Sequence, residues 1–191
     1  MNKQPEITDA TREALTDSFC SLALRKPIGD MTVREIAEES GHNRTTFYRY
    51  FTSVYDLLDH LEDSMIEGFL QSVKTGKNAF EFDDSFFRSI IGYMRDHRDR
   101  LLVVFGESNR SSFIAKLQKW IMRNMGMENS EHNRITMTIY FSGITAALTA
   151  WLEDNSAVNE EDLISVMGRL FTRWYLPEIT GGNSEPENKK E

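Results

Sequence analysis

The stretch TVREIAEESGHNRTTFYRYF, residues 32–51, decides the fold. Thr32 and Glu35 have the spacing of a capping box, in which two side chains satisfy free backbone N–H groups at the start of a helix. Gly41 ends the short helix that follows, and Asn43 can cap a second short helix. Two short helices joined by a tight turn that contains glycine are the pattern of a helix-turn-helix.

The second of these helices carries side chains that suit DNA. Between Asn43 and Tyr50 there are two guanidinium groups, two hydroxyls, an amide and two phenols, and all of these can hydrogen-bond phosphate oxygens or base edges. No Asp or Glu stands between Ser40 and Tyr55, although the chain has 30 acidic and 22 basic residues and a formal charge of -8. The sequence therefore predicts a local positive surface on an acidic protein, and DNA binding needs only such a local surface.

Helical patterns continue along the rest of the chain. Apolar residues recur three and four positions apart, and no segment shows the alternation of a strand. We therefore expect an all-α fold with about nine helices, in which Phe47 and Phe51 belong to the core. The expected ranges are about 9–26, 32–40, 43–51, 53–74, 86–97, 101–105, 111–125, 131–152 and 160–175.

The chain is expected to divide into three parts. Residues 1–52 should form a three-helix unit with the helix-turn-helix, and residues 53–179 a larger helical unit. Residues 180–191 consist mainly of Gly, Ser, Asn, Pro and charged residues without an apolar anchor. This composition predicts a disordered tail.

Several classes of protein are disfavoured. The single cysteine, Cys20, allows no internal disulfide, and the first residues lack the pattern of a signal peptide, so we expect a cytoplasmic protein. The uncharged run Ile135–Leu152 contains small residues and a polar stripe, Thr138, Ser142, Thr145 and Thr149. These features favour a packing helix over a membrane span. No two of the four histidines lie three or four positions apart, and no catalytic motif is seen. We therefore expect no metal site, no cofactor and no enzymatic activity.

The same motif matches a known family. The pattern Thr32-Val33-x-x-Ile36-Ala37-x-x-x-Gly41, followed by Thr46-Phe47-Tyr48-x-Tyr50-Phe51 and Leu57-Leu58, resembles the N-terminal domain of the TetR family of bacterial transcriptional regulators. The resemblance covers about residues 9–60. It implies that the larger unit senses a ligand and forms a dimer. The segment Ile139–Leu152 is also similar to a subgroup common in low-GC Gram-positive bacteria.

The resemblance, together with the donor chemistry, indicates the residues that contact DNA. They are Thr32, His42, Asn43, Arg44, Thr45, Thr46, Tyr48, Arg49 and Tyr50. Tyr50 has an alternative role as a core residue whose hydroxyl faces water. His42 is a secondary candidate, placed near DNA by its position in the turn.

Three features depart from the family pattern. His42-Asn43 replaces the usual Val-Ser, Thr45 replaces a small residue or glycine, and Val54 replaces a lysine that anchors phosphate in similar proteins. The loss of that lysine removes one contact with the phosphate backbone of DNA. Affinity should therefore depend more on the remaining donors of the second helix and on its N-terminal amides.

The resemblance also implies a ligand pocket and a dimer interface in the larger unit. The side chains that combine an apolar body with a polar atom are the candidates for the pocket, namely Tyr93, His97, Trp120 and Tyr140. The last two helices should form the interface. Its candidates are Ser142, Gly143, Ala146, Ala147, Ala150, Val166, Leu170 and Trp174.

The sequence thus favours a homodimeric transcriptional regulator, with repression the expected outcome. It would bind a palindromic DNA operator and leave it when a small molecule occupies the larger unit. The alternative is a co-regulator of the same family that acts through another protein. The missing lysine at Val54 and the acidic charge of the chain are the features in its favour.

Overall fold

The computed structural model describes residues 5–74, 84–124, 130–154 and 158–175. These residues form nine α-helices and no strand, which confirms the all-α prediction. The helices are α1 (Pro5–Ala23), α2 (Val33–Glu39), α3 (Arg44–Phe47), α4 (Val54–Lys74), α5 (Asp84–Asp96), α6 (Arg98–Val104), α7 (Arg110–Asn124), α8 (Glu131–Glu153) and α9 (Glu160–Leu170). A 3-10 turn, Ile28–Asp30, precedes α2, and a π-helical turn, Phe171–Tyr175, follows α9. The predicted tail, 180–191, lies outside the described residues.

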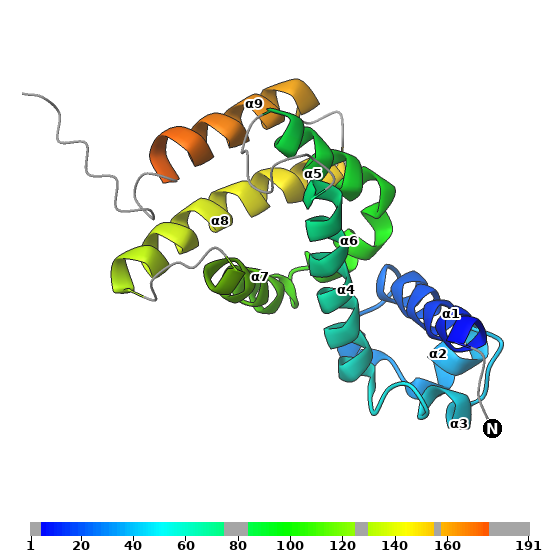
Figure 1. Ribbon diagram of the computed structural model, residues 1–191. Helices are drawn as coiled ribbons and strands as arrows, with labels where there is room; N and C mark the ends of the chain where they lie inside the picture. The colour runs from blue at the N-terminus through cyan, green and yellow to red at the C-terminus, as the bar shows by residue number, and fades with distance from the viewer. Residues whose placement is uncertain (1–4, 75–83, 125–129, 155–157, 176–191) are drawn as a thin grey trace, which may run out of the picture.

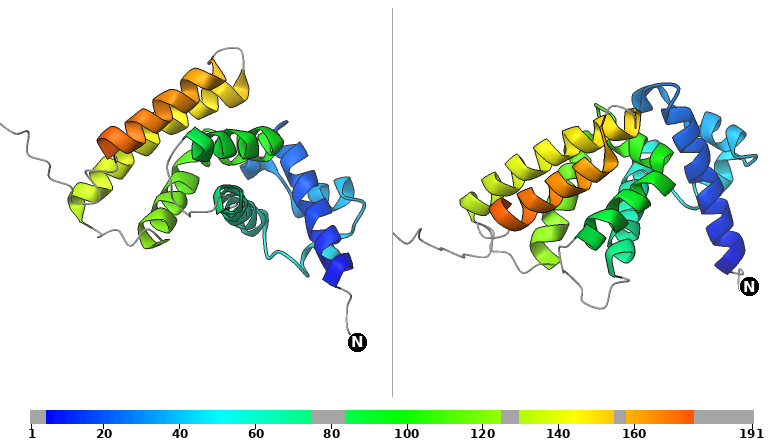
Figure 2. Two further views of the ribbon diagram at one scale, coloured as in Figure 1. Left: turned by 45° about the horizontal axis from the view of Figure 1, so that its top comes forward. Right: turned by 90° about the horizontal axis from the view of Figure 1, so that it is seen from above.

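The helices form a small and a larger unit. α1, α2 and α3 lie together at one end of the molecule, and α4 runs from them into the larger unit (Figure 1). α8 and α9 lie side by side in every view (Figure 2). α5 packs closely on α4 and α9, and α6 packs closely on α1 and α4, whereas α7 approaches its neighbours less closely.

The helix-turn-helix forms for the local reasons that the sequence indicates. Glu35 N donates to Thr32 Oγ1 at 3.3 Å, and Thr32 N donates to the Glu35 carboxylate at 2.9 Å, so both halves of the capping box are present. Gly41 has a φ of 71°, a left-handed conformation that side chains disfavour. His42 N donates to Ala37 O at 2.8 Å and closes the turn.

The core of the small unit includes residues from α4. Phe47 is fully buried and Phe51 is 4% exposed, which confirms both as core residues. Leu57 and Leu61 of α4 are fully buried in the same hydrophobic cluster. Because α4 takes part in both units, the domain boundary at residue 52 stays a prediction.

Some helix ends differ from the predicted ones. α1 begins at Pro5 rather than near residue 9, and it ends at Ala23 because the next residues form tighter turns, with Arg25 N donating to Leu22 O. α3 has only four residues, and the chain continues from it as a turn. α6 begins at Arg98, three residues earlier than predicted. Differences of this size between predicted and observed helix ends are usual, because helix ends fray and their bounds depend on local capping.

α8 is, by length and composition, the one described helix that could cross a membrane. One face of it is nevertheless buried among the other helices, with Met137 and Leu152 both 1% exposed. Thr145 and Thr149 are also buried, whereas Thr138 and Ser142 of the predicted polar stripe are exposed. We therefore interpret α8 as a core helix with one open face.

Ion pairs connect the larger unit to α1 and join α7 to α4. Arg100 of α6 donates to Glu13 of α1 and, at 2.6 Å, to Asp17 of α1. Lys116 of α7 donates to Asp59 of α4 at 2.5 Å. α4 and α6 therefore both connect the larger unit to the helix-turn-helix.

Candidate nucleic-acid interface and ligand cavity

The start of α3 is fixed by its cap. Asn43 Oδ1 accepts hydrogen bonds from Thr46 N at 2.9 Å and from Thr46 Oγ1 at 3.2 Å. Phe47 then points into the core. Asn43 and Thr46 were predicted to contact DNA. In the structure their side chains form a hydrogen bond with each other, and their contacts with DNA stay predictions.

The other side chains of α3 and of the turn after it point outward. Arg44, Thr45 and Arg49 are exposed, and Tyr48 is 58% exposed. The Tyr48 ring meets the Phe47 ring edge-on, with 5.7 Å between the ring centroids. The core contact of Phe47 therefore orients an exposed phenol beside two exposed guanidinium groups.

Most of the described basic residues of the small unit form ion pairs, except those in α3 and in the turn after it. Four of its described basic residues form ion pairs: Arg12 with Asp9, Arg25 with Glu39, Lys26 with Glu35 and Arg34 with Glu38. Among the described residues before α4, the remaining basic side chains are Arg44 and Arg49, and neither has a carboxylate partner. Uncompensated positive charge is therefore concentrated at α3.

The side chains of Thr32 and Tyr50 both contact other side chains of the small unit. The Thr32 hydroxyl donates to Glu35 Oε2 at 2.8 Å. Hydrogen bonds from Lys26 and then from Thr32 lower the pKa of Glu35 to about 2. Tyr50 is half-buried, and the Arg12 guanidinium carbon lies 5.9 Å from the centre of its ring. This placement agrees with the core alternative for Tyr50, and its contact with DNA stays a prediction.

The start of α4 differs from the pattern of the resembling family. Val54 is 8% exposed and belongs to the core, so the lysine of that pattern is replaced by a packing residue. Thr52 N donates to Asp56 Oδ2 at 2.6 Å, which places a carboxylate at this helix start. Hydrogen bonds from Thr52 lower the pKa of Asp56. Tyr55, which is not among the predicted DNA contacts, is 62% exposed at this helix start.

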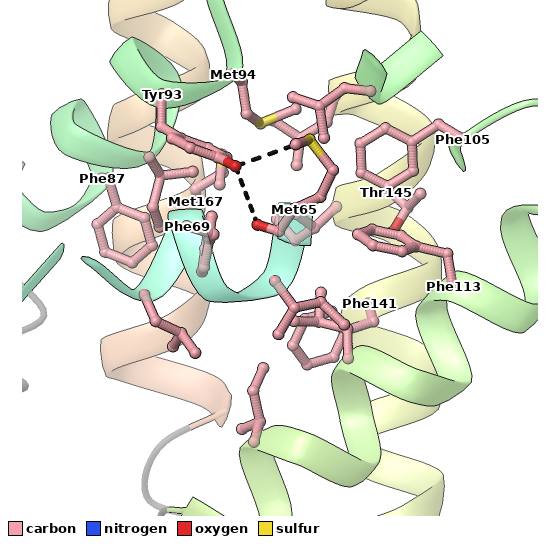
Figure 3. Close-up of a pocket in the computed structure, with 18 of the residues that line it drawn as sticks. Met65, Phe69, Phe87, Tyr93, Met94, Phe105, Phe113, Phe141, Thr145 and Met167 are labelled. Carbon is pink, nitrogen blue, oxygen red and sulfur yellow. Dashed lines mark hydrogen bonds between the residues drawn. The ribbon is translucent and has the colours of Figure 1, made fainter. Parts of the chain in front are cut away.

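A cavity of about 120 Å³ lies inside the larger unit (Figure 3). Its wall comes from α4 to α9 and the turns that follow α6 and α9. Tyr93, Trp120 and Tyr140, three of the predicted pocket residues, are part of this wall. The Tyr93 hydroxyl donates to Met65 O at 3.2 Å.

His97, the fourth predicted pocket residue, does not line the cavity. α5 ends at Asp96, and the His97 ring stacks on the Tyr93 ring with 4.2 Å between the centroids. Its Nδ1 lies 2.9 Å from Tyr93 O. His97 instead lines a groove between α1 and the α5–α6 junction. His97 is therefore not part of the wall of this cavity, because its ring lies against Tyr93 of the preceding turn, and its role in ligand binding stays a prediction.

An exposed apolar stripe runs along α8 and α9. Ile135 is 53% exposed and Ile139 is 70% exposed, and both lie on α8. The predicted interface residues Ser142, Gly143, Ala146, Val166 and Leu170 are exposed, and Ala147 and Ala150 are half-buried. The side chain of Trp174 lies outside the described residues. Ile135 and Ile139 were absent from the predicted set, although their four-residue spacing places them on the same face as Ala146.

Comparisons with known proteins cover both units. Residues 20–61 match a family model described as bacterial regulatory proteins, tetR family. Residues 84–173 match a model of a transcriptional regulator C-terminal region. The fold is similar to the solved structure of the fatty acid degradation regulator FadR from Bacillus halodurans, with a TM-score of 0.57 and 14% sequence identity over 89% of this chain and 96% of that chain. No curated protein sequence matches the chain significantly.

Proposed function

Because this chain belongs to the TetR family of bacterial transcriptional regulators, we propose that it is a repressor that binds a palindromic operator as a homodimer. A small molecule in the cavity of the larger unit then releases it. Regulation of transcription is the activity of the family. The operator, the dimer and the release by a ligand are the proposed steps.

The observation that carries the proposal is the pair of unpaired guanidinium groups at α3. Arg44 and Arg49 are exposed and have no carboxylate partner among the described residues, in a protein with a formal charge of -8. Exposed positive charge next to hydroxyl and phenol groups suits phosphate oxygens and base edges. Four other basic residues of the same unit are neutralised by neighbours. The electrostatic attraction between this unit and DNA would therefore be strongest at α3 and the turn after it.

A homodimer accounts for the open face of α8 and α9. A contiguous exposed apolar surface marks an interaction site in soluble proteins. Two copies of this chain would bury Ile139 and its neighbours between four helices, two from each subunit. The two α3 helices of such a dimer would read half-sites roughly 34–36 Å apart.

The path from the cavity to the DNA runs through α4. Met65 and Phe69 of α4 line the cavity, and Leu57, two turns earlier on the same helix, is part of the helix-turn-helix core. A ligand that binds better to one position of α4 would shift the protein toward that position. The distance between the two α3 helices of the dimer would then no longer match the distance between the two half-sites of the operator.

The test is selection of bound sequences from random double-stranded DNA with the full chain. We expect enrichment of a two-fold symmetric site and affinity that falls as salt rises. The double variant Arg44→Ala/Arg49→Ala should lose at least about 30-fold in affinity, because each such contact contributes about 1–3 kcal/mol and two contacts are removed. The control is Arg25→Ala/Arg34→Ala, which removes two arginines that are already paired with glutamates. Equal affinity of the two double variants would contradict the proposal.

The start of α4 favours a second candidate function. Val54 is buried and Asp56 carries a carboxylate, so this helix start attracts a DNA phosphate less strongly than one that carries a lysine. A co-regulator that acts through a protein partner needs no strong contact there. That alternative predicts no enriched sequence in the selection, and no effect of Arg44→Ala on weak, non-specific binding beyond that of Arg34→Ala.

A further inference from the structure

The wall of the cavity in the larger unit carries no formal charge. None of the residues that line it is Asp, Glu, Lys, Arg or His. Four of them bear a polar side-chain atom, namely Tyr93, Trp120, Tyr140 and Thr145, and the rest are apolar. An ionised group buried there would lose its hydration without gaining a counter-charge, which is strongly unfavourable.

The Thr145 hydroxyl lacks the hydrogen bond that several other threonines on the helices of this protein form. Thr16, Thr138 and Thr172 each donate to the carbonyl four residues earlier, at distances of 2.8–2.9 Å. The Thr145 side chain lies in the cavity wall and the residue is 4% exposed (Figure 3). Among the residues that the structure describes, none forms a hydrogen bond with its hydroxyl. Tyr93, in contrast, already donates to Met65 O.

We propose that Thr145 Oγ1 is the polar recognition point of this cavity and that the ligand is an uncharged, largely hydrocarbon molecule with one neutral hydrogen-bonding group. A hydroxyl, a carbonyl or an ether oxygen is such a group. The link from this ligand to DNA release rests on the proposed function, whereas its binding does not. The inference assigns the ligand's chemical class and the residue that selects it.

The volume of the cavity limits the size of the small molecules that can test this proposal. At about 120 Å³, it is near the ~150 Å³ of engineered apolar cavities that accept benzene. A single aromatic ring therefore fits without a change of the wall. Ligands larger than a single ring need part of the wall to move.

The experiment uses toluene, phenol and benzoate at pH 7.5 as matched probes, with dissociation constants from protein-observed NMR titrations of the full chain. Thr145→Val keeps the shape of the side chain and removes its hydroxyl. We expect it to weaken phenol binding about three- to tenfold, as the loss of one hydrogen bond does, and to leave toluene binding unchanged. Benzoate should bind the wild type at least about 100-fold more weakly than phenol does.

Thr149→Val is the matched control. Thr149 is also a buried threonine of α8 whose hydroxyl lacks a partner among the described residues, but it does not line the cavity. This variant should bind phenol and toluene like the wild type. Thermal unfolding of both variants checks that they fold, and Thr145→Ala provides a second test of the hydroxyl if Thr145→Val does not fold.

Three results would overturn the assignment. They are benzoate binding as tight as phenol binding, an equal loss for toluene and phenol in Thr145→Val, and a wild-type protein that binds none of the probes. DNA binding is measured separately. If phenol binds through Thr145 and operator affinity is unchanged, the assignment of the site holds and the proposed release by this class of ligand fails. If the protein binds no operator, the proposed function fails and the probe titrations still decide the site.

Discussion

The ring of Tyr93 lies against the backbone of α4 at Gly68. A Cβ atom on Gly68 would stand 2.9 Å from both Cε2 and Cζ of Tyr93, and closer still to its hydroxyl oxygen. The Tyr93 hydroxyl donates to the carbonyl of Met65, which lies nearly one turn before Gly68. The missing side chain at Gly68 thus allows an aromatic residue of α5 to reach the α4 backbone at the cavity wall.

Gly68→Ala should therefore destabilise the protein. In an unobstructed helix interior, this change would raise stability by about 1 kcal/mol. Here the Tyr93 ring must move and give up its hydrogen bond to Met65, and overpacking of this kind costs about 1–3 kcal/mol. We expect a net loss of ~1 kcal/mol in the free energy of unfolding, measured by urea denaturation.

Two controls separate the clash from the helix effect. Gly92→Ala changes a glycine of α5 that has nothing within 4 Å of the added Cβ, and it should raise stability. In a Tyr93→Ala background, Gly68→Ala should also raise stability, because the ring is absent. Destabilisation by Gly68→Ala in that background as well would show that the ring is not the cause.

The parts of this structure that sequence could predict are set by short-range physics. The capping box of Thr32 and Glu35 and the turn at Gly41 depend on residues within a few positions of each other. The burial of Phe47 follows from apolar spacing along one helix. Such short-range signals are sufficient to predict a helix-turn-helix from the sequence.

The direction of single side chains in the larger unit was harder to predict, because it depends on how helices pack. His97 lies outside the cavity wall because its ring stacks on Tyr93, one turn earlier. Thr145 was assigned to a packing stripe, and only the placement of α4 and α7 shows that it faces a cavity. Ile139 was missed because periodicity does not show which face of an apolar helix stays uncovered.

Arg44 and Tyr48 should affect DNA binding in different ways. Arg44→Ala should relax the preference at one base position by about 1–3 kcal/mol, as expected for the loss of a bidentate contact to a base. Tyr48→Phe should weaken binding to all sequences alike, because a phenol hydroxyl that binds phosphate carries no base information. Both effects are measured by equilibrium binding to the selected operator and to its single-base variants.

Arg34→Ala is the control for this comparison. Arg34 is exposed, like Arg44 and Arg49, but it pairs with Glu38 at 2.7 Å. It should leave both affinity and base preference near those of the wild type. If all three variants have the same binding profile as the wild type, α3 does not read the DNA directly.

Ile139→Glu should dissociate the proposed dimer. Ile139 is 70% exposed at the centre of the α8 stripe, so a second subunit would bury it, and a carboxylate there would lose its hydration. We expect a monomer in sedimentation experiments at micromolar concentration and weaker operator binding. Arg134→Glu introduces a carboxylate on α8 about 140° around the helix from Ile139, at an exposed position, and should leave the dimer intact. A dimer that persists in Ile139→Glu would place the interface elsewhere.

Lys116 should stabilise the protein in a pH-dependent way. Its ammonium group lies 3.0 Å from Asp63 and 3.4 Å from Glu62, and Glu62 is 3% exposed. Burial raises the pKa of Glu62, and Lys116 opposes this rise. A carboxyl group whose folded-state pKa is raised stabilises the fold fully below its unfolded-state pKa, and this contribution is lost as the pH rises through the folded-state pKa.

Lys116→Met removes the opposing charge and leaves the Glu62 carboxylate buried without a counter-ion. The pKa of Glu62 should rise further, so the cost of ionising it should grow with pH. We expect a loss of about 1–3 kcal/mol in unfolding free energy at pH 7.5 and a much smaller loss near pH 4.5, where Glu62 can stay protonated. Lys119→Met, at an exposed lysine of the same helix, is the control and should change stability little at either pH. In a Glu62→Gln background, the pH dependence of the Lys116→Met effect should largely disappear. An equal loss at both pH values in the original background would mean that Lys116 acts through Asp59 and Asp63 rather than through Glu62.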